Sequence, residues 1–404
     1  MFTAPMFTAP MFTAPMFTIT HSLRRSVCVM SGLLAAVAIV IAGCSCVAQA
    51  QPTPAPVAQQ RVVSAPLPSP ETALTRVAFG SCLNQTKPQP IWAAVIAAKP
   101  DLMVMTGDNV YGSTIDDTLE PLKAAYAGQA ANAEFRAARE RLPMLAIWDD
   151  HDFGRNDGGG DYALKARAAD MFDAFWGPLP DRPASGSLYH ARSYGPLGRR
   201  VQIILLDTRF YRSSLQPKSP AFPHWGRYEP DPDPAKTMLG EAQWRWLESQ
   251  LAQPADVRII VSSIQVLAEG HGFERWGNLP NERARLLRLV ERTAGRTVFV
   301  SGDRHYGAFY DLALPSNATL NAPDVSAPGT KVSPPDRTIV EMTASAMNMA
   351  SGRPAQDARM APLVSDIVGS DNFGLASIDW EARTLTLSLQ GSDGAVFASR
   401  NVRF

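Results

Sequence analysis

The sequence predicts an α/β protein in which short buried strands alternate with helices. From about Glu71 onward, apolar runs of four to six residues alternate with longer stretches of helical periodicity. Several of these runs are apolar at consecutive positions, which is typical of strands covered on both faces. The chain of 404 residues is 46% hydrophobic and 19% charged, so it can bury a sizeable core.

The expected elements follow one another along the chain. Strands are expected at the apolar runs Arg76–Phe79, Leu102–Thr106, Met144–Trp148, Val201–Leu206, Arg258–Ser262 and Thr297–Val300. Helices are expected at the periodic stretches between them, Ile91–Ala98, Leu119–Tyr126, Asn132–Arg141, Ala163–Phe175, Gly240–Gln253 and Asn281–Thr293. A loop rich in proline and serine, Asn317–Arg337, precedes a C-terminal β-hairpin of Leu375–Trp380 and Thr384–Leu389. Because no linker interrupts this order, residues 71–404 are interpreted as one domain.

The first fifty residues have the pattern of an export signal. A basic segment, His21–Arg25, is followed by the apolar run Gly32–Gly43 and by the small residues Ala48–Ala50. This order is that of a cleaved signal peptide, and the apolar run is too short to span a bilayer comfortably. We therefore expect residues 1–50 to be removed and the rest of the chain to be exported to the periplasm or the medium.

Three features of this segment leave alternatives open. Ile41–Cys44 resembles a bacterial lipobox, in which Cys44 would be lipidated and would tether the protein to a membrane. The pair Arg24 and Arg25 weakly resembles a twin-arginine signal, the route for proteins that are exported already folded. Three tandem copies of Met-Phe-Thr-Ala-Pro stand before the signal and favour a later start codon, at Met16 or Met30.

Composition limits what the exported part can bind and how it is cross-linked. Residues 51–70 are rich in proline, alanine, glutamine and serine and are expected to form a linker. The formal net charge is zero, with 38 basic and 38 acidic residues, which disfavours non-specific binding of nucleic acid.

Cleavage after Ala50 would leave Cys82 as the only cysteine. Cys82 would then have no disulfide partner within the chain, so it is a buried thiol, a nucleophile or a metal ligand.

Polar and ionisable side chains directly follow each of the six expected strands. Open α/β sheets bind their ligands at the carboxyl ends of their strands, so these residues are expected to lie along one rim. They form six short segments: Gly80–Cys82, Gly107–Tyr111, Asp149–Asp152, Asp207–Arg209, Ser263–Gln265 and Gly302–His305. Together the segments supply carboxylates, a thiol, imidazoles, a phenol and an amide.

This set of side chains favours a two-metal centre for phosphoryl transfer. Such a centre needs a carboxylate that bridges two cations, further ligands on each side, and a proton donor for the leaving group. The chain has six histidines in all, too few for a histidine-rich zinc site. A cysteine thiolate with a tyrosine phenolate suits trivalent iron, whereas aspartate and amide oxygens suit a hard cation such as calcium.

Four of the segments together resemble the PhoD-like alkaline phosphatases, a branch of the calcineurin-like metallophosphoesterases. The resemblance rests on Phe79–Cys82, Gly107–Tyr111, Trp148–Gly154 and Ser301–His305, and it continues in the same order through Leu206–Arg212, Ser262–Gln265 and Trp276–Arg283. It covers roughly Val77 to Phe309. The resemblance implies a four-layer α/β/β/α sandwich of metallophosphoesterase type and hydrolysis of phosphate mono- or diesters. It also implies an iron (Fe³⁺) and calcium (Ca²⁺) centre, with zinc or manganese as alternative metals.

The same resemblance implies which residues bind metal. Cys82, Asp108 and Tyr111 correspond to iron ligands, and Asp108 also bridges to the second metal. Asp150 corresponds to a ligand of that second metal. Asp303 and His305 stand where the superfamily has the ligands of its Gly-His-x-His motif, with aspartate in place of the first histidine.

Further residues are implied to act in catalysis or substrate binding. His151 resembles the catalytic histidine that protonates the leaving oxygen or stabilises the phosphoryl group, with Asp152 orienting its ring. Arg209 and Arg304 are candidate phosphate contacts through their planar guanidinium groups, and a salt bridge is an equal alternative for Arg209. Asn278 is a candidate residue of the pocket wall.

The leading interpretation is an exported, metal-dependent phosphoesterase whose catalytic domain is residues 71–404. It would hydrolyse small phosphate mono- or diesters, or phospholipids, with metal-activated water at a two-metal centre. A phospholipase D-like enzyme or a nucleotide phosphodiesterase is the alternative within this class, because the ester type depends on the shape of the pocket. A non-catalytic protein that binds phosphate or polyanions is the alternative of a different class. Five retained residues argue against it: Asp108, Asp150, His151, Asp303 and His305.

Overall fold

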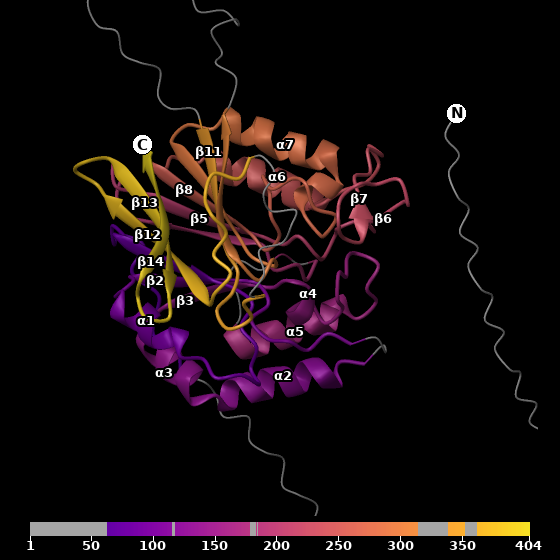
Figure 1. Ribbon diagram of the computed structural model, residues 1–404. Helices are drawn as coiled ribbons and strands as arrows, with labels where there is room; N and C mark the ends of the chain where they lie inside the picture. The colour runs from indigo at the N-terminus through magenta and orange to yellow at the C-terminus, as the bar shows by residue number, and fades with distance from the viewer. Residues whose placement is uncertain (1–62, 115–117, 178–182, 184, 314–337, 352–361) are drawn as a thin grey trace, which may run out of the picture. The chain divides into compact units, whose positions relative to one another are not determined.

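The computed structural model describes residues 63–114, 118–177, 183, 185–313, 338–351 and 362–404 (Figure 1). Contacts divide the chain into the units Met1–Val57 and Ala58–Phe404, and every described residue belongs to the second unit. The predicted signal peptide with Cys44, the first part of the linker and the loop Asn317–Arg337 lie outside the described residues. Among the helices of the described part, none has both the length and the apolar character needed to cross a bilayer.

The last residues of the expected linker belong to the folded unit. Arg139 Nε donates a hydrogen bond to Ser64 Oγ (2.7 Å), and the amide of Ala65 donates to the carbonyl of Arg139 (2.8 Å). The amide of Gly195 donates to the carbonyl of Pro70 (2.7 Å). The folded part therefore begins before the boundary at residue 71 that the sequence predicts, because a proline-rich segment can still pair its remaining backbone groups.

Two large mixed sheets form the centre of this unit. The strand orders are β14–β13–β12–β1–β2–β3 in the first sheet and β10–β11–β9–β8–β5–β4 in the second. The first sheet contains β1 (Arg76–Gly80), β2 (Leu102–Thr106), β3 (Met144–Ile147), β12 (Asn372–Asp379), β13 (Thr384–Gly391) and β14 (Val396–Arg403). The second contains β4 (His190–Tyr194), β5 (Val201–Leu206), β8 (Val257–Ser262), β9 (Arg296–Ser301), β10 (Gly307–Ala313) and β11 (Thr338–Ala344). A separate small hairpin pairs β6 (Gln216–Pro217) with β7 (Tyr228–Glu229).

The six strands that the sequence predicts are parallel neighbours, three in each sheet. Strands β1, β2 and β3 pair in parallel in the first sheet, and β5, β8 and β9 do so in the second. Strand β11 extends the second parallel set, and antiparallel strands complete both sheets. Each sheet therefore presents the loops that follow three predicted strands at one edge.

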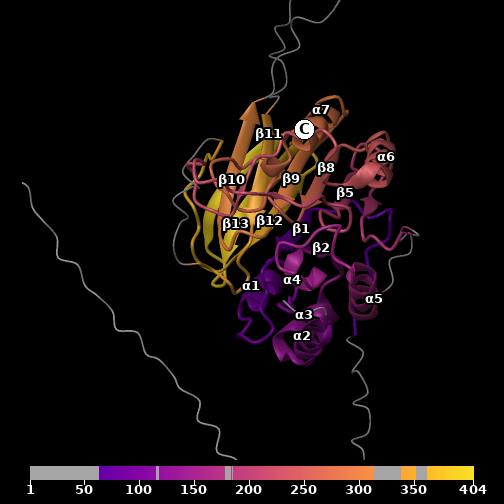
Figure 2. The same ribbon diagram turned by 90° about the vertical axis from the view of Figure 1, so that its right-hand side faces the viewer.

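Helices cover the outer faces of the two sheets, which gives four layers (Figures 1 and 2). Alternate residues of β5 show this: Val201 and Ile203 belong to the core between the sheets, whereas Ile204 and Leu206 pack with residues of α6 and α7. On the side of the first sheet are α1 (Ile91–Ala97), α2 (Glu120–Ala131), α3 (Ala133–Arg141) and α5 (Lys165–Trp176), and on the side of the second are α6 (Gly240–Leu251) and α7 (Pro280–Glu291). Two short helices, α4 (Asp150–Phe153) and η1 (Trp276–Asn278), lie in the loops.

The predicted four-layer sandwich and its C-terminal hairpin, now β12 and β13, are confirmed.

Several other elements have no pattern in the sequence that predicts them. Strands β4, β10 and β14 are sheet edges, and β4 and β14 are too polar to form an apolar run. Strand β11 carries the buried Glu341 in its middle. Helix α4 has four residues, too few to show helical periodicity.

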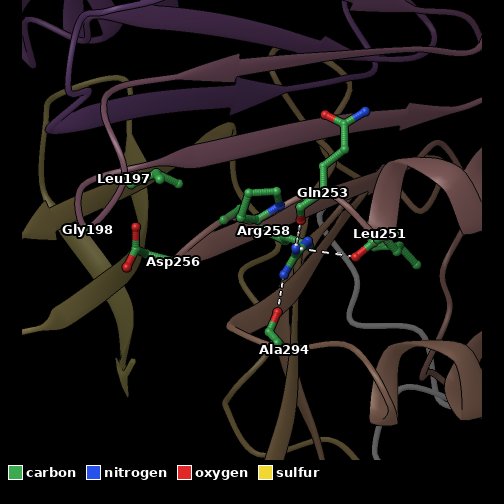
Figure 3. A pocket seen from close by; sticks show the side chains of 10 residues that line it. Leu197, Gly198, Leu251, Gln253, Asp256, Arg258 and Ala294 are labelled. Atoms are coloured by element: carbon green, nitrogen blue, oxygen red, sulfur yellow. Dashed lines mark hydrogen bonds between the residues drawn. The ribbon is translucent and has the colours of Figure 1, made fainter.

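A surface cavity of about 350 Å³ lies at the amino ends of β5, β8 and β9, away from the loops that follow these strands (Figure 3). Arg258 contributes the main charged group of its wall and is buried. Its guanidinium donates to the carbonyls of Leu251 (3.3 Å), Gln253 and Ala294. These carbonyls lie at or just beyond the ends of α6 and α7, where backbone acceptors lack partners within the helix. Arg258 thus caps these helix ends, and the cavity lies apart from the polar segments that follow the strands.

Candidate metal centre

The loops that follow the parallel strands of the two sheets meet at a set of ionisable side chains. Cys82 follows β1, Asp108 follows β2, and His305 follows β9. One ligand atom from each of these three residues lies within 4.8 Å of the other two. The approach of the loops depends on Gly107, whose φ is 112° and where an added Cβ would lie 2.6 Å from the Cβ of Asp149. The rim that the sequence predicts therefore exists, and both sheets contribute to it.

Four residues of these loops have a left-handed backbone conformation that side chains rarely adopt. Cys82, Asp108, Asp303 and His305 have φ values of 57°, 50°, 70° and 56°. Each such residue costs about 1–2 kcal/mol, so it persists only where its surroundings enforce it. Hydrogen bonds between the loops do so here: the amide of Cys82 donates to Gly107 O (3.4 Å), and the amide of Leu83 donates to Asp108 O (2.9 Å). Strain of this kind is typical of functional sites.

The first group of donors contains a thiol, a carboxylate, a phenol and an imidazole. Cys82 Sγ lies 3.6 Å from Asp108 Oδ2. The Tyr111 hydroxyl lies 3.3 Å from the same oxygen and 2.9 Å from His305 Nε2. Ser345 Oγ lies 3.2 Å from Cys82 Sγ and accepts a hydrogen bond from the amide of His305 (3.0 Å). Burial raises the pKa of the Cys82 thiol to about 11, so a thiolate here requires a nearby cation.

Asp108 is shared with a second group, which contains Asp150 and His151. Its Oδ1 accepts a hydrogen bond from the amide of His151 (3.3 Å), while its Oδ2 faces the first group. Burial, together with the charge of Asp150, raises the pKa of Asp108 well above its ordinary value. A carboxylate placed between two donor groups is what a ligand that bridges two cations requires.

The carboxylates beyond Asp108 are short of positive partners. Asp150 also forms a group with Asp149 and Asp303. Asp149 Oδ2, Asp150 Oδ1 and Asp303 Oδ2 are buried and have no hydrogen-bond partner within the described part of the chain. Buried, unpaired carboxylate oxygens are costly unless a cation binds them. The donors therefore fit two metal ions, one on each side of Asp108.

Arg209 lies in a buried ion-pair network and not at an open substrate site. The residue has no exposed surface, and its Nη2 and Nε lie 2.5 and 2.7 Å from Asp149 Oδ1. Its Nη1 lies 2.7 Å from Glu274 Oε2, and Glu274 also pairs with Arg212 (2.7 Å). Of the two alternatives for Arg209, the structure supports the salt bridge. The guanidinium offsets part of the negative charge of the aspartates.

Ser113, and not Asp152, contacts the ring of His151 in the described structure. Ser113 Oγ lies 2.8 Å from His151 Nδ1, and the Tyr111 ring packs beside the imidazole with 4.3 Å between ring centroids. Asp152 instead accepts hydrogen bonds from the amide of Asp149 (2.6 Å) and from the side chain of Asn109. These contacts cap α4, so Asp152 fixes the backbone that carries His151 and does not orient its ring directly.

The other two predicted substrate contacts differ in their placement. Arg304 Nη1 lies 3.9 Å from Asp303 Oδ2, and the guanidinium stands over the Phe273 ring, 4.2 Å from its centroid. Arg304 is therefore beside the carboxylate of Asp303. Asn278 is fully buried, and its Oδ1 accepts a hydrogen bond from the amide of Arg275 (2.7 Å). It stabilises the turn η1 and does not form a pocket wall.

Sequence reasoning misses several residues of this region, and one of them carries a usable signal. Ser345 directly follows β11, so the rule that strand ends carry ligands applies to it once that strand is known. Ser113, Asp157 and Glu274 lie further along the chain, beyond the short segments that directly follow β2, β3 and β8. Asp157 and Glu274 form a further group with Asp150, yet both are paired with arginines.

Comparison with known proteins gives one family. Residues 77–379 match the family model described as PhoD-like phosphatase. Among curated proteins, a stretch of 58 residues is 38% identical to "Probable inactive purple acid phosphatase 29" of Arabidopsis thaliana. This stretch is 14% of the present chain and 13% of the relative, so it covers a small part of both proteins.

Solved structures with a similar fold include PhoD and a plant phosphatase. The structure of PhoD is 18% identical, with a TM-score of 0.60 over 83% of the present chain and 69% of PhoD. Purple acid phosphatase PPD1 from yellow lupin (Lupinus luteus) seeds is 13% identical, with a TM-score of 0.52 over 83% of the present chain and 55% of the lupin chain. At these identities the likeness establishes the four-layer fold.

Replacing Arg209 should destabilise the folded protein strongly. In Arg209→Met, Asp149 and Glu274 would stay buried without their shared guanidinium, and the free energy of unfolding should fall by about 3–5 kcal/mol. Chemical denaturation of the metal-loaded protein measures this loss. The matched control is Arg227→Met, which breaks an ion pair with Asp157 from a side chain that is 62% exposed. It should cost about 1 kcal/mol or less. Equal stability of Arg209→Met and the wild type would contradict the network.

Proposed function

The chain belongs to the PhoD-like phosphatase family, and from this premise we propose that it is a metal-dependent hydrolase of phosphate mono- or diesters. The observation that carries the proposal is the position of Asp108. Its two carboxylate oxygens face two different groups of buried donors, as a ligand that bridges two metal ions must. The buried oxygens of the neighbouring aspartates that have no hydrogen-bond partner in the described part of the chain support the same conclusion.

We assign the two ions from the chemistry of the donors. Cys82, Asp108, Tyr111 and His305 combine a thiol, a phenol and an imidazole with a carboxylate, which suits Fe³⁺. On the other side of Asp108 the donors are mainly carboxylates, from Asp150 and Asp303 with Asp149 beside them, which suits Ca²⁺. When bound, such ions neutralise the charge of a transferring phosphoryl group and activate an attacking water.

The chain's own side chains would then bind the ester and move a proton. Ser113 engages His151 Nδ1, so we assign delivery of a proton to the leaving oxygen to Nε2. Arg304 projects beside Asp303, and its guanidinium is placed to hold phosphoryl oxygens through paired N–H groups. Arg209 and Asp152 act indirectly, because they fix the carboxylates and the loop that carries His151.

We propose the reaction as phosphoester hydrolysis but leave several classes of ester open as its substrate. Small phosphate monoesters, diesters and phospholipids all present the phosphoryl oxygens that such a centre binds. Parallel assays on nitrophenyl phosphate, bis(nitrophenyl) phosphate and phosphatidylcholine separate an alkaline phosphatase from a phosphodiesterase and from a phospholipase D-like enzyme. The substrate with the highest kcat/KM identifies the class.

We also propose that the protein is exported, because its first fifty residues have the order of a signal peptide. Export places the folded domain in the periplasm or the medium, with a membrane tether if Cys44 is lipidated. The mass of the mature protein separates the alternatives. Cleavage after Ala50 gives an unmodified chain, whereas lipidation gives a chain that begins at Cys44 and carries acyl groups. An uncleaved N-terminus would contradict export by this route.

Removing Asp108 should abolish metal binding and turnover together. The wild-type protein, expressed in the periplasm, should hold about one iron per chain together with calcium, as measured by plasma mass spectrometry. Asp108→Ala should lose both metals and all hydrolysis of nitrophenyl esters, because the shared ligand of both groups is gone. The control Asp393→Ala removes an exposed carboxylate far along the sequence and should change neither quantity.

Other outcomes of this experiment have defined meanings. A fully active Asp108→Ala variant would contradict the proposed centre. Zinc or manganese in place of iron and calcium would keep the hydrolase but overturn the ligand assignment. No stoichiometric metal, with no activity restored by adding metal, would favour a non-catalytic protein that binds phosphate or polyanions.

Replacing His151 should slow catalysis without loss of the bound metal ions. In His151→Ala the metal content should stay at the wild-type level, because the thiol, phenol and carboxylate donors all remain. The value of kcat should fall by about 10²–10⁴-fold, the usual contribution of a general acid. Steady-state kinetics and metal analysis on one sample separate the two effects. Unchanged kcat would remove His151 from the mechanism.

A further inference from the structure

A line of side-chain contacts leads from the candidate metal centre to the protein surface. It starts at Asp303, continues through Arg304 (3.9 Å) and reaches Phe273, whose ring centroid lies 4.2 Å from the Arg304 guanidinium carbon. Phe273 in turn packs edge-to-face against Trp225, with 4.8 Å between ring centroids and an interplanar angle of 76°. Phe273 therefore lies beside the Arg304 guanidinium, and the exposed Trp225 packs against Phe273.

Trp225 is exposed although the backbone that carries it is held firmly. Its side chain is 63% exposed, the most of any tryptophan in the described residues. The amide of Gly272 donates to Trp225 O (2.7 Å), and the amide of Arg227 donates to Gly272 O (2.6 Å). Between them Gly226 has a φ of 140°, and a Cβ at Gly226 would lie 2.1 Å from the carbonyl carbon of Gly272. The ring is thus presented to solvent by a fixed bridge between two loops.

The same two loops are attached to the centre by polar contacts. Arg227 Nη1 and the Tyr228 hydroxyl each lie 2.8 Å from Asp157 Oδ2, and Asp157 lies in one carboxylate group with Asp150. On the other loop, Glu274, the residue after Phe273, pairs with Arg209 (2.7 Å), which in turn pairs with Asp149 (2.5 Å). Single exposed hydrophobic residues are common and need no function. A fixed, exposed tryptophan that packs on the aromatic neighbour of Arg304 is different, because it extends to the surface a row of side chains that starts at Asp303.

We propose that Trp225 and Phe273 form a subsite that binds an aromatic ring in the alcohol part of a phosphate ester, while Arg304 contacts its phosphoryl oxygens. The inference rests on the proposed hydrolase function. The flat face of an indole favours another aromatic ring, because stacked rings gain both contact area and complementary charge distribution. The preferred substrates are therefore esters such as nucleoside phosphates or aryl phosphates, and esters of purely aliphatic alcohols are poorer ones.

The kinetic test compares two substrates that differ only in the aromatic ring, adenosine 5′-monophosphate and ribose 5-phosphate. Trp225→Ala should lower kcat/KM for the nucleotide about tenfold, the size of one stacked ring, and change it less than twofold for the sugar phosphate. Trp225→Phe should retain most of the activity on the nucleotide. The control Leu197→Ala removes another exposed apolar side chain, 68% exposed and lining the cavity at the amino ends of the second sheet's strands. It should affect neither substrate.

A binding test separates the subsite from turnover. Calorimetry with phenylphosphonate and methylphosphonate, which are not esters, should show about tenfold tighter binding of the phenyl compound to the wild type and no preference in Trp225→Ala. Equal affinities in the wild type, or equal losses for both substrates in Trp225→Ala, would overturn the subsite while leaving the hydrolase intact. A phenyl preference in a protein that hydrolyses no ester would support the subsite and contradict the proposed function.

Discussion

Repulsion among buried carboxylates is the constraint on which the rest of the site depends. Asp108, Asp149 and Asp150 are each at most 3% exposed. One oxygen of Asp108 lies within 4.8 Å of one of Asp150, and Asp149, Asp150 and Asp303 form a further group with the same spacing. Burial together with neighbouring carboxylates raises the pKa of Asp108 well above its ordinary value, and such crowding of like charges opposes folding. Arg209 offsets part of this charge from inside the protein. The remaining charge calls for cations, so metal binding and the stability of these loops are coupled.

The fold holds these mutually repelling carboxylates in place through backbone geometry as well as through the charge of Arg209. Three parallel strands in each of two sheets end at the same rim, and their loops hold Cys82, Asp108, Asp303 and His305 in left-handed conformations. Such conformations are tolerated because a large apolar core on both faces of each sheet fixes the strands that precede them. The strain is confined to the turns, where it aims four different donors at one place. A more relaxed set of turns would leave the same residues pointing apart.

Positive charge around the centre is divided between inner and outer arginines. Arg209 and Arg212 are buried and pair with Asp149 and Glu274, so they have structural partners already. Arg304 stands closer to the surface, between Asp303 and the rings of Phe273 and Trp225. The inner arginines therefore stabilise the architecture of the loops, whereas the outer arginine is the one that we propose for the ester.

The sequence by itself determined the six parallel strands, the polar segments at their ends and the family, because buried parallel strands are continuous apolar runs and their carboxyl ends share one edge. The roles of Cys82, Asp108 and Tyr111 as metal ligands are implied by the family resemblance and stay predictions. Only the tertiary structure decided which side chains meet. In the structure Ser113, and not Asp152, contacts the His151 ring. Arg209 is buried in ion pairs, and Asn278 lies in a turn. These partners come from loops without periodicity, so their pairing depends on contacts that no local pattern records.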